Sequence, residues 1–211
     1  DINNWKDLGG IDAPIVLHAP DENSGIANIF LEKIMLPLGG AMAASTIRHG
    51  SNVDMVDEVA RDPFSIGLTT LSEQGNTRPL TLVGGCGFKS NASPDALKSE
   101  DYPLTAPLFL YLKSRRLPAA GREFMRFTQS PAAQIAVLRA GFVDQAIART
   151  PVNRQGERLA NAIRNAGDEI GLSDLQNLVS NMDGSRRLSI TFRFQDGSSD
   201  LDAQSRSNVV L

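Results

Sequence analysis

The sequence predicts an α/β fold, because short apolar strands alternate with helices of amphipathic spacing. A strand over 13–18 precedes a helix over 24–36. The Ser51-x-x-Asp54 pattern then resembles a capping box that opens a second helix. Apolar runs at 64–68 and 79–83 predict two further strands. This alternation favours a layered α/β domain.

The second half continues with a polar stretch over 87–101, which we expect to be a loop. A strongly apolar run over 108–112 predicts a strand, and 119–128 predicts a helix. Ser130 is followed by Pro131, and Gly141 comes ten residues later. Proline near a helix start and glycine after its end are typical of one further helix.

The last third has a different pattern. A charged segment over 154–182 carries apolar residues at helical spacing. Residues 187–194 alternate between apolar and polar side chains, which predicts a half-buried strand. The final residues, 196–211, are polar.

The composition of the chain argues against two classes of function, nucleic-acid binding and membrane spanning. The chain has 211 residues, a net charge of −3 and a pI near 5.4, which argues against nucleic acid as a partner because phosphate backbones need a basic face. No apolar run reaches the ~18 to 20 residues that cross a bilayer, so we expect no transmembrane segment. The sequence begins with Asp1 and shows no secretory signal. The absence of a signal in this sequence does not decide the cellular compartment.

Cysteine and histidine counts bear on cofactors. The single cysteine, Cys86, excludes an internal disulfide and lies in a glycine cluster that is typical of a turn. Two histidines argue against a histidine-based metal centre. We therefore expect no metal, no cofactor and no catalytic residue.

Residues 21–27, between the first strand and its helix, are the candidate site. Small polar residues and a glycine there leave backbone N–H groups unpaired at a helix start. Those donors and the helix dipole suit a small anion. The same residues could simply cap the helix, since Asn23 and Ser24 are preferred N-caps. Both interpretations remain open at this point.

Several short motifs then occur in a fixed order along residues 1–147. They are Trp5-x-x-Leu8-Gly9, Ile15 to His18, Asp21-x-x-Ser24-Gly25 with Phe30, Asp62-x-x-Ser65-Ile66-Gly67, Ser99 to Leu104, Phe124-x-x-Phe127-x-x-Ser130 and Gly141-Phe142-Val143. This ordered set resembles the phosphate-binding proteins of bacterial ABC phosphate transporters, which have the two-lobed periplasmic solute-binding fold of type II.

The resemblance implies a domain organisation. Residues 12–84 would form lobe two, and 102–145 would form the returning part of lobe one. The N-terminal part of lobe one, with about half of the family's anion contacts, would be missing from this sequence. A helical linker over 148–186 would follow.

The resemblance also implies the ligand and its contacts. Phosphate or a related oxyanion would bind at the helix N-terminus, and an ABC transporter permease would be the partner in the periplasm. The expected ligand-binding residues are Asn23, Ser24, Gly25, Ile26, Ala27 and His18. Two positions depart from the family, which usually has Arg where Pro20 stands and Thr where Ile26 stands. The carboxylates of Asp21 and Glu22 would repel an anion unless they point away.

The tail carries a second resemblance. Residues 187–194, followed by Gly197-Ser198-Ser199-x-Leu201-Asp202, look like the opening strand and turn of an OmpA-like peptidoglycan-binding domain. Residues 187–211 would then be the start of such a domain. Peptidoglycan would be a partner only through a domain that continues beyond this chain.

Two other functions stay open. A hydrolase could use Ser24 as nucleophile, although the Gly-x-Ser-x-Gly elbow is absent and only His18 and His49 could serve as a histidine base. Alternatively, a degenerate solute-binding lobe could act as a structural or signalling module tethered to the cell wall. Arg48 and His49 could face the cleft, although a surface position is expected for both. Lys113, Arg115 and Arg116 are expected at a solvated strand end.

Overall fold

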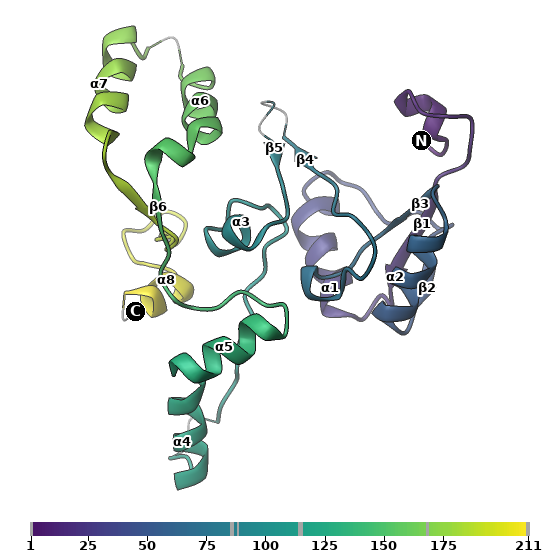
Figure 1. Cartoon of the computed structure of the whole chain (residues 1–211), viewed down its shortest axis with the longest axis horizontal. Coiled ribbons are helices and arrows are strands. Elements are labelled where there is room, and N and C mark those ends of the chain that lie inside the picture. Colours follow the sequence, from purple (N-terminus) through teal and green to yellow (C-terminus); the bar gives the residue numbers. More distant parts are fainter. Residues whose placement is uncertain (1, 85–86, 88, 114–115, 168, 210–211) are drawn as a thin grey trace. The chain divides into compact units, whose positions relative to one another are not determined.

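The computed structural model (Figure 1) describes residues 2–84, 87, 89–113, 116–167 and 169–209. The chain divides into two compact units. Unit 1 comprises residues 1–79, 106–112 and 139–142, and unit 2 comprises residues 80–105, 113–138 and 143–211. The expectations for Cys86 and Arg115 concern positions outside the described residues.

A three-stranded parallel sheet forms the centre of unit 1. Its strands β1 (Val16–Pro20), β2 (Ile47–His49) and β3 (Ser65–Gly67) lie in the order β2-β1-β3. The register pairs His18 with Ile47 on one side and with Gly67 on the other. The predicted strands at 13–18 and 64–68 are therefore confirmed, with β1 shifted toward its carboxyl end.

Helix α2 (Asn52–Arg61) packs against all three strands. The side chains of Met55 and Val56 are almost fully buried, and Ala19 of β1 is fully buried. Full burial of a methionine or valine side chain contributes about 1.5–3 kcal/mol to stability. The helix begins as predicted, because Ser51 Oγ accepts a hydrogen bond of 3.3 Å from the amide of Asp54.

Helix α1 (Gly25–Phe30) follows β1 and continues without a break into η2 (Leu31–Met35), a π-helical segment. The helix expected over 24–36 is thus confirmed in position and length. The amide of Leu36 bonds to the carbonyl of Leu31, five residues back, at 2.8 Å. Such π-type segments usually occur as single turns inside or next to α-helices.

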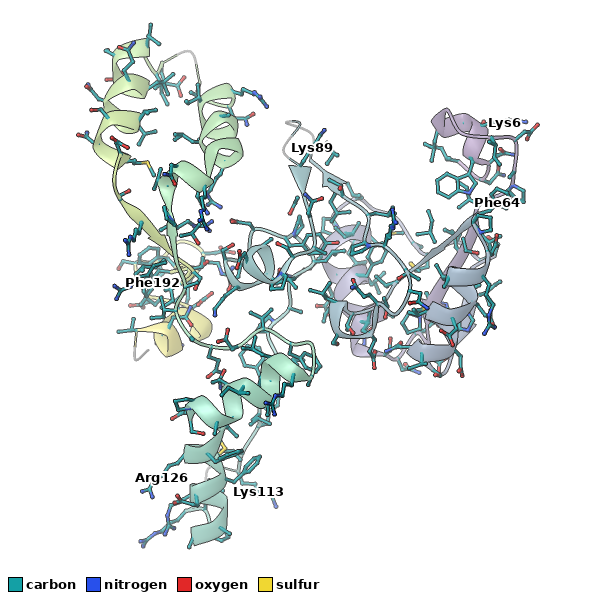
Figure 2. All side chains as sticks on the ribbon, in the orientation of Figure 1. Lys6, Phe64, Lys89, Lys113, Arg126 and Phe192 are labelled. Carbon is teal, nitrogen blue, oxygen red and sulfur yellow. The ribbon has the colours of Figure 1, made fainter. Side chains whose placement is uncertain are left out.

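Two 3₁₀ turns complete the described helices of unit 1, η1 (Trp5–Leu8) and η3 (Leu71–Glu73). Trp5 Nε1 donates a hydrogen bond of 3.0 Å to the carbonyl of Phe64, just before β3. Trp5 thereby ties the N-terminal turn to the sheet. Figure 2 shows the side chains on the ribbon and labels Phe64.

Unit 2 is mainly helical, with two small antiparallel ribbons. Its elements are β4 (Leu82–Val83), β5 (Lys89–Ser90), α3 (Pro94–Lys98), α4 (Ala119–Thr128), α5 (Pro131–Arg139, its last residue assigned to unit 1), β6 (Arg149–Pro151), η4 (Val152–Arg154), α6 (Gly156–Arg164), α7 (Leu172–Met182), β7 (Arg186–Leu188) and α8 (Ala203–Asn208). Strand β4 pairs with β5, and β6 pairs with β7. Helices α4 and α5 confirm the predictions for 119–128 and for the helix after Ser130.

Two predictions for the middle of the chain were wrong. Residues 108–112 form no strand, and their large side chains, from Leu108 to Leu112, are exposed. A strand takes its hydrogen bonds from a neighbouring strand, and within the described residues none pairs with this run. The stretch 87–101 is not purely a loop, because Ser93 caps α3 through a bond of 3.2 Å to the amide of Ala96.

The tail also differs from the prediction. The helix expected over 154–182 is divided between the end of η4, helix α6, which ends at Arg164, and helix α7, which begins at Leu172. The strand expected over 187–194 is limited to β7, which pairs with β6 over only three residues. Phe192 and Phe194 are half exposed or more, so the described residues bury their side chains only in part.

Within the described residues, no helix has the length and apolar character needed to cross a membrane. The predicted domain limits at 84, 102, 147 and 186 remain predictions.

Candidate functional site

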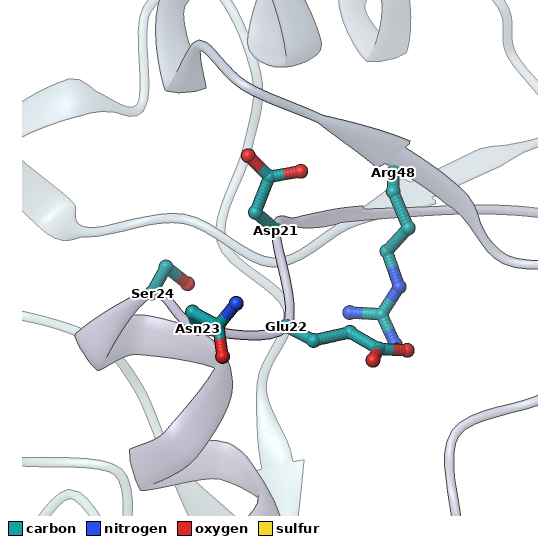
Figure 3. Close-up of a pocket in the computed structure, with 5 residues that line it drawn as sticks. All are labelled: Asp21, Glu22, Asn23, Ser24 and Arg48. Carbon is teal, nitrogen blue, oxygen red and sulfur yellow. The ribbon is translucent and has the colours of Figure 1, made fainter.

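A pocket of about 520 Å³ lies in unit 1 where β1 ends and α1 begins. It is lined by Asp21, Glu22, Asn23, Ser24 and Arg48 (Figure 3). Four of these residues form the loop between the strand and the helix, and Arg48 comes from the adjacent strand β2. Parallel register brings the carboxyl ends of β1 and β2 to the same edge, which places Arg48 beside the loop.

Ser24 is the N-cap of α1. Its Oγ accepts a hydrogen bond of 3.1 Å from the amide of Ala27. The amides of Gly25 and Ile26 have no acceptor among the described residues. The start of α1 therefore combines both sequence interpretations, because a side chain caps one amide and two others remain available to a ligand.

Arg48 is the one pocket residue that sequence reasoning placed at the surface. Its Nη1 donates to the carbonyl of Pro20 at 3.0 Å, and its Nη2 lies 3.4 Å from Glu22 Oε1. The side chain is only 26% exposed. A basic residue near the carboxyl end of a strand could have indicated a place in the pocket. The short strand over 47–49 was not predicted, so this indication was missed.

The two carboxylates of the loop differ in direction. Figure 3 shows Glu22 extending toward Arg48, whereas the carboxylate of Asp21 points away from the start of α1. The backbone amide of Asp21 donates to the carbonyl of His49 at 3.0 Å, which fixes the loop against β2. Asp21 thus leaves the Ser24 side of the pocket open to an anion.

His18, predicted as a ligand residue, is not among the residues that line the pocket. It is buried, and its ring stacks on that of His49 with 5.1 Å between centroids. Within the described residues, neither histidine hydrogen-bonds to Ser24. The structure therefore places Asn23 and Ser24 in the pocket lining and His18 in a separate cluster. Gly25, Ile26 and Ala27 follow in α1 and are not among the lining residues, and the amide of Ala27 is already bonded to Ser24.

The cluster also includes Ser65 of β3 and Asp62, which precedes β3 in the sequence. His18 Nε2 lies 3.2 Å from Ser65 Oγ, and Ser65 donates to Asp62 Oδ2 at 2.6 Å. Burial is the main cause that lowers the pKa of His18 below 6.5, and the neighbouring His49 lowers it further, against the opposing effect of Glu58 and Asp62. Hydrogen bonds from Ser65 and from the amide of Phe64 lower the pKa of Asp62.

A parallel sheet with a polar pocket at the carboxyl ends of its strands is the arrangement of α/β ligand-binding domains. Residues 1–132 match the family described as the PBP superfamily domain. Since that match covers more than half of the 211 residues, the chain belongs to this family. The predicted fold of the periplasmic-binding-protein type is confirmed.

Individual relatives agree with this assignment. Protein SphX of Synechocystis sp. is 32% identical over 123 residues, which are 55% of this chain and 36% of that protein. A Clostridium perfringens protein, described as a phosphate ABC transporter substrate-binding protein and solved with bound phosphate, has a TM-score of 0.54 at 22% identity. That alignment covers 69% of this chain and 58% of the Clostridium chain.

An ABC-type phosphate transport receptor from Vibrio cholerae gives the same TM-score, 0.54, at 19% identity, and the alignment covers 67% of this chain and 57% of that one. At these identities the structural likeness establishes the fold. The chain spans between about a third and three fifths of the length of these proteins.

Proposed function

We propose that this chain binds phosphate or a related oxyanion, without catalysis, where α1 begins. It would act as part of an ABC transporter substrate-binding protein in the periplasm, with the transporter permease as partner. The observation that carries this proposal is a group of donors in and next to one pocket. Ser24 and Arg48 line the pocket, and the amides of Gly25 and Ile26, which follow Ser24 in the sequence, lack acceptors among the described residues.

These donors suit a small oxyanion chemically. Backbone amides at a helix start and the positive end of the helix dipole favour negative charge. A guanidinium adds a charge-assisted hydrogen bond, which contributes about 1.5–3 kcal/mol. The hydroxyl of Ser24 can donate to the anion while its oxygen still accepts from Ala27. Asn23 would offer its side-chain amide from the rim of the same pocket.

Glu22 does not block this role. Its side chain is 79% exposed, and its oxygen lies 3.4 Å from Arg48 Nη2. Exposed ion pairs contribute only about 0.2–1 kcal/mol. Arg48 can therefore exchange this carboxylate for an incoming phosphate oxygen at low cost. The relatives described as phosphate transport proteins make phosphate the first ligand to test.

The second candidate is a structural or signalling module without ligand. Two contacts favour this candidate. Ser24 Oγ already accepts a hydrogen bond from the amide of Ala27, and Glu22 already accepts one from Arg48. In that case the pocket residues satisfy one another and the fold alone is retained. Attachment to peptidoglycan through an OmpA-like domain would belong to this candidate.

Isothermal titration calorimetry of the chain separates the two candidates. Phosphate and sulfate are titrated separately at constant ionic strength, with chloride as the reference anion. Saturable heat with phosphate or sulfate, at one equivalent per chain, supports the binding module. Absence of heat with both oxyanions at millimolar concentration would reject the proposal and favour the structural module.

A further inference from the structure

The two histidines of the chain lie side by side on neighbouring strands of the unit 1 sheet. His18 Nδ1, from β1, is 2.9 Å from His49 Nε2, from β2. Each of these nitrogens is 3.9 Å from Glu58 Oε2, which comes from α2. The geometry points to a binding site for a divalent transition-metal ion of the zinc class, formed by His18, His49 and Glu58.

The distances fit such an ion. A point equidistant from the three donor atoms lies about 2.1 Å from each, within the Zn–N and Zn–O ranges of about 2.0–2.2 Å. Tetrahedral angles at these bond lengths would separate the donor atoms by about 3.3–3.4 Å. The nitrogens would therefore move apart and Glu58 would move closer, each by about half an ångström. Side-chain rotations on fixed backbone elements supply shifts of this size.

A hydrogen-bonded chain orients His18 for this role. Ser65 Oγ donates its proton to Asp62 Oδ2 at 2.6 Å, so it must accept from His18 Nε2 at 3.2 Å. The proton of His18 is therefore on Nε2, and the lone pair of Nδ1 faces His49. A metal-ligating histidine usually donates its other ring N–H to a supporting group, which fixes its tautomer. The carboxylate of Asp62, acting through Ser65, completes that support.

The three proposed ligands differ in their exposure to solvent. His18 is buried, and its Nδ1 faces both His49 Nε2 and Glu58 Oε2. The Glu58 side chain is 53% exposed, so water has access from that side. Two imidazoles and one carboxylate are a known three-ligand set for zinc, with a fourth position left to water.

The histidine count alone argued against a metal centre, because it did not include a carboxylate from a distant helix. Glu58 is separated from His18 by 40 positions in the sequence, and only the packing of α2 on β1 and β2 brings it near both rings. This site is distinct in composition from the phosphate pocket, which none of its three ligands lines.

Zinc titration of the full chain tests the proposal. The protein is purified without a histidine tag, and Zn²⁺ is titrated in a phosphate-free buffer against a chromophoric chelator. We expect one equivalent of Zn²⁺ to bind per chain. Glu58→Gln should weaken binding at least tenfold, because it removes the anionic ligand. Asp57→Asn, on the neighbouring exposed position of α2, should leave the affinity unchanged.

Two further measurements keep the test decisive. Ser65→Ala should weaken Zn²⁺ binding about 10–100-fold, as expected for loss of a supporting hydrogen bond. Visible absorption of bound Co²⁺ should appear with the wild-type chain and disappear with His49→Gln. If Zn²⁺ does not bind saturably at micromolar concentration, or if Glu58→Gln binds it as tightly as wild type, the proposal is wrong. Phosphate is absent throughout, so this outcome is independent of oxyanion binding.

Discussion

Arg48 Nη1 donates a hydrogen bond of 3.0 Å to the carbonyl oxygen of Pro20, the last residue of β1. The related phosphate-binding proteins that the sequence resembles usually have an arginine at the position of Pro20. In this chain Arg48, from the neighbouring strand β2, brings a guanidinium to the backbone of Pro20, 28 positions away in sequence.

The first prediction concerns this arginine. Arg48→Gln should weaken phosphate binding by about 1.5–3 kcal/mol, or one to two decades, because a charge-assisted hydrogen bond is lost. Calorimetry with phosphate measures the change. Arg78→Gln removes the same charge from an exposed position of unit 1 and should leave the affinity unchanged. Equal affinities for the two variants would show that Arg48 does not contact the ligand.

The second prediction concerns Ile26, whose amide has no acceptor among the described residues. Ile26→Thr adds a hydroxyl at the helix start, where the resembled family usually has threonine. The added hydrogen bond should strengthen phosphate binding by about 0.5–1.5 kcal/mol, roughly two- to tenfold. Ile26→Val has nearly the shape of threonine without the hydroxyl and is the matched control. A gain shared by both variants would assign the effect to packing.

The third prediction concerns the approach of α2 to β3. A Cβ placed on Gly67 would lie 2.8 Å from Val59 Cγ2. Valine is stiff about its first side-chain torsion in a helix, so it can give way little. Gly67→Ala should therefore lower the free energy of unfolding by about 1–3 kcal/mol, as measured by urea denaturation.

Gly25→Ala is the control for that measurement. A Cβ on Gly25 meets nothing within 4 Å, and Gly25 is the first residue of α1. This variant should raise stability by about 0.4–1 kcal/mol through the unfolded state and keep the amide available to phosphate. If Gly67→Ala is as stable as Gly25→Ala, then α2 and β3 tolerate a wider separation than their packing indicates.

Much of unit 1 could be predicted because local signals and packing agree there. Ser51 and Ser24 are both preferred caps, and each bonds to the amide three residues later. The run over 108–112 misled the prediction, since apolar composition indicates a strand only where a partner strand exists. Beyond Leu188, the alternating run over 187–194 has only an isolated bridge, between Phe194 and Leu201, and no further strand pairing among the described residues.

The candidate site was only half predictable. The loop over 21–27 is contiguous, so composition and the helix start together indicated it. Arg48 reaches the pocket through parallel strand register, and Glu58 reaches the proposed metal site through helix packing; no local pattern encodes either. His18 was assigned to the pocket from its nearness in sequence, yet strand periodicity turns its side chain toward His49 and Ser65.

The fourth prediction concerns a carboxylate in unit 2. Asp101 accepts hydrogen bonds from Arg187 Nη1 at 2.5 Å and Nη2 at 3.0 Å, and it also pairs with Arg158. This contact ties residues after α3 to β7. Asp101→Asn should lower the free energy of unfolding by about 1–3 kcal/mol at neutral pH, because the guanidinium of Arg187 loses its anionic partner. Asp196→Asn, at an exposed position of the same unit, should have little effect.

The pH dependence of the Asp101 contact follows from its pKa. Burial raises this pKa, but hydrogen bonds from Arg187 and Ser99 and the charge of Arg158 outweigh it, so the folded-state pKa lies below 3.8. The unfolded chain then binds more protons in this range, and the stabilisation is complete above about pH 4 to 5 and is lost as pH falls through the folded-state pKa. In urea denaturation, wild type should therefore lose more stability than Asp101→Asn on acidification. Parallel pH profiles of the two proteins would show that the carboxylate is not held by these arginines.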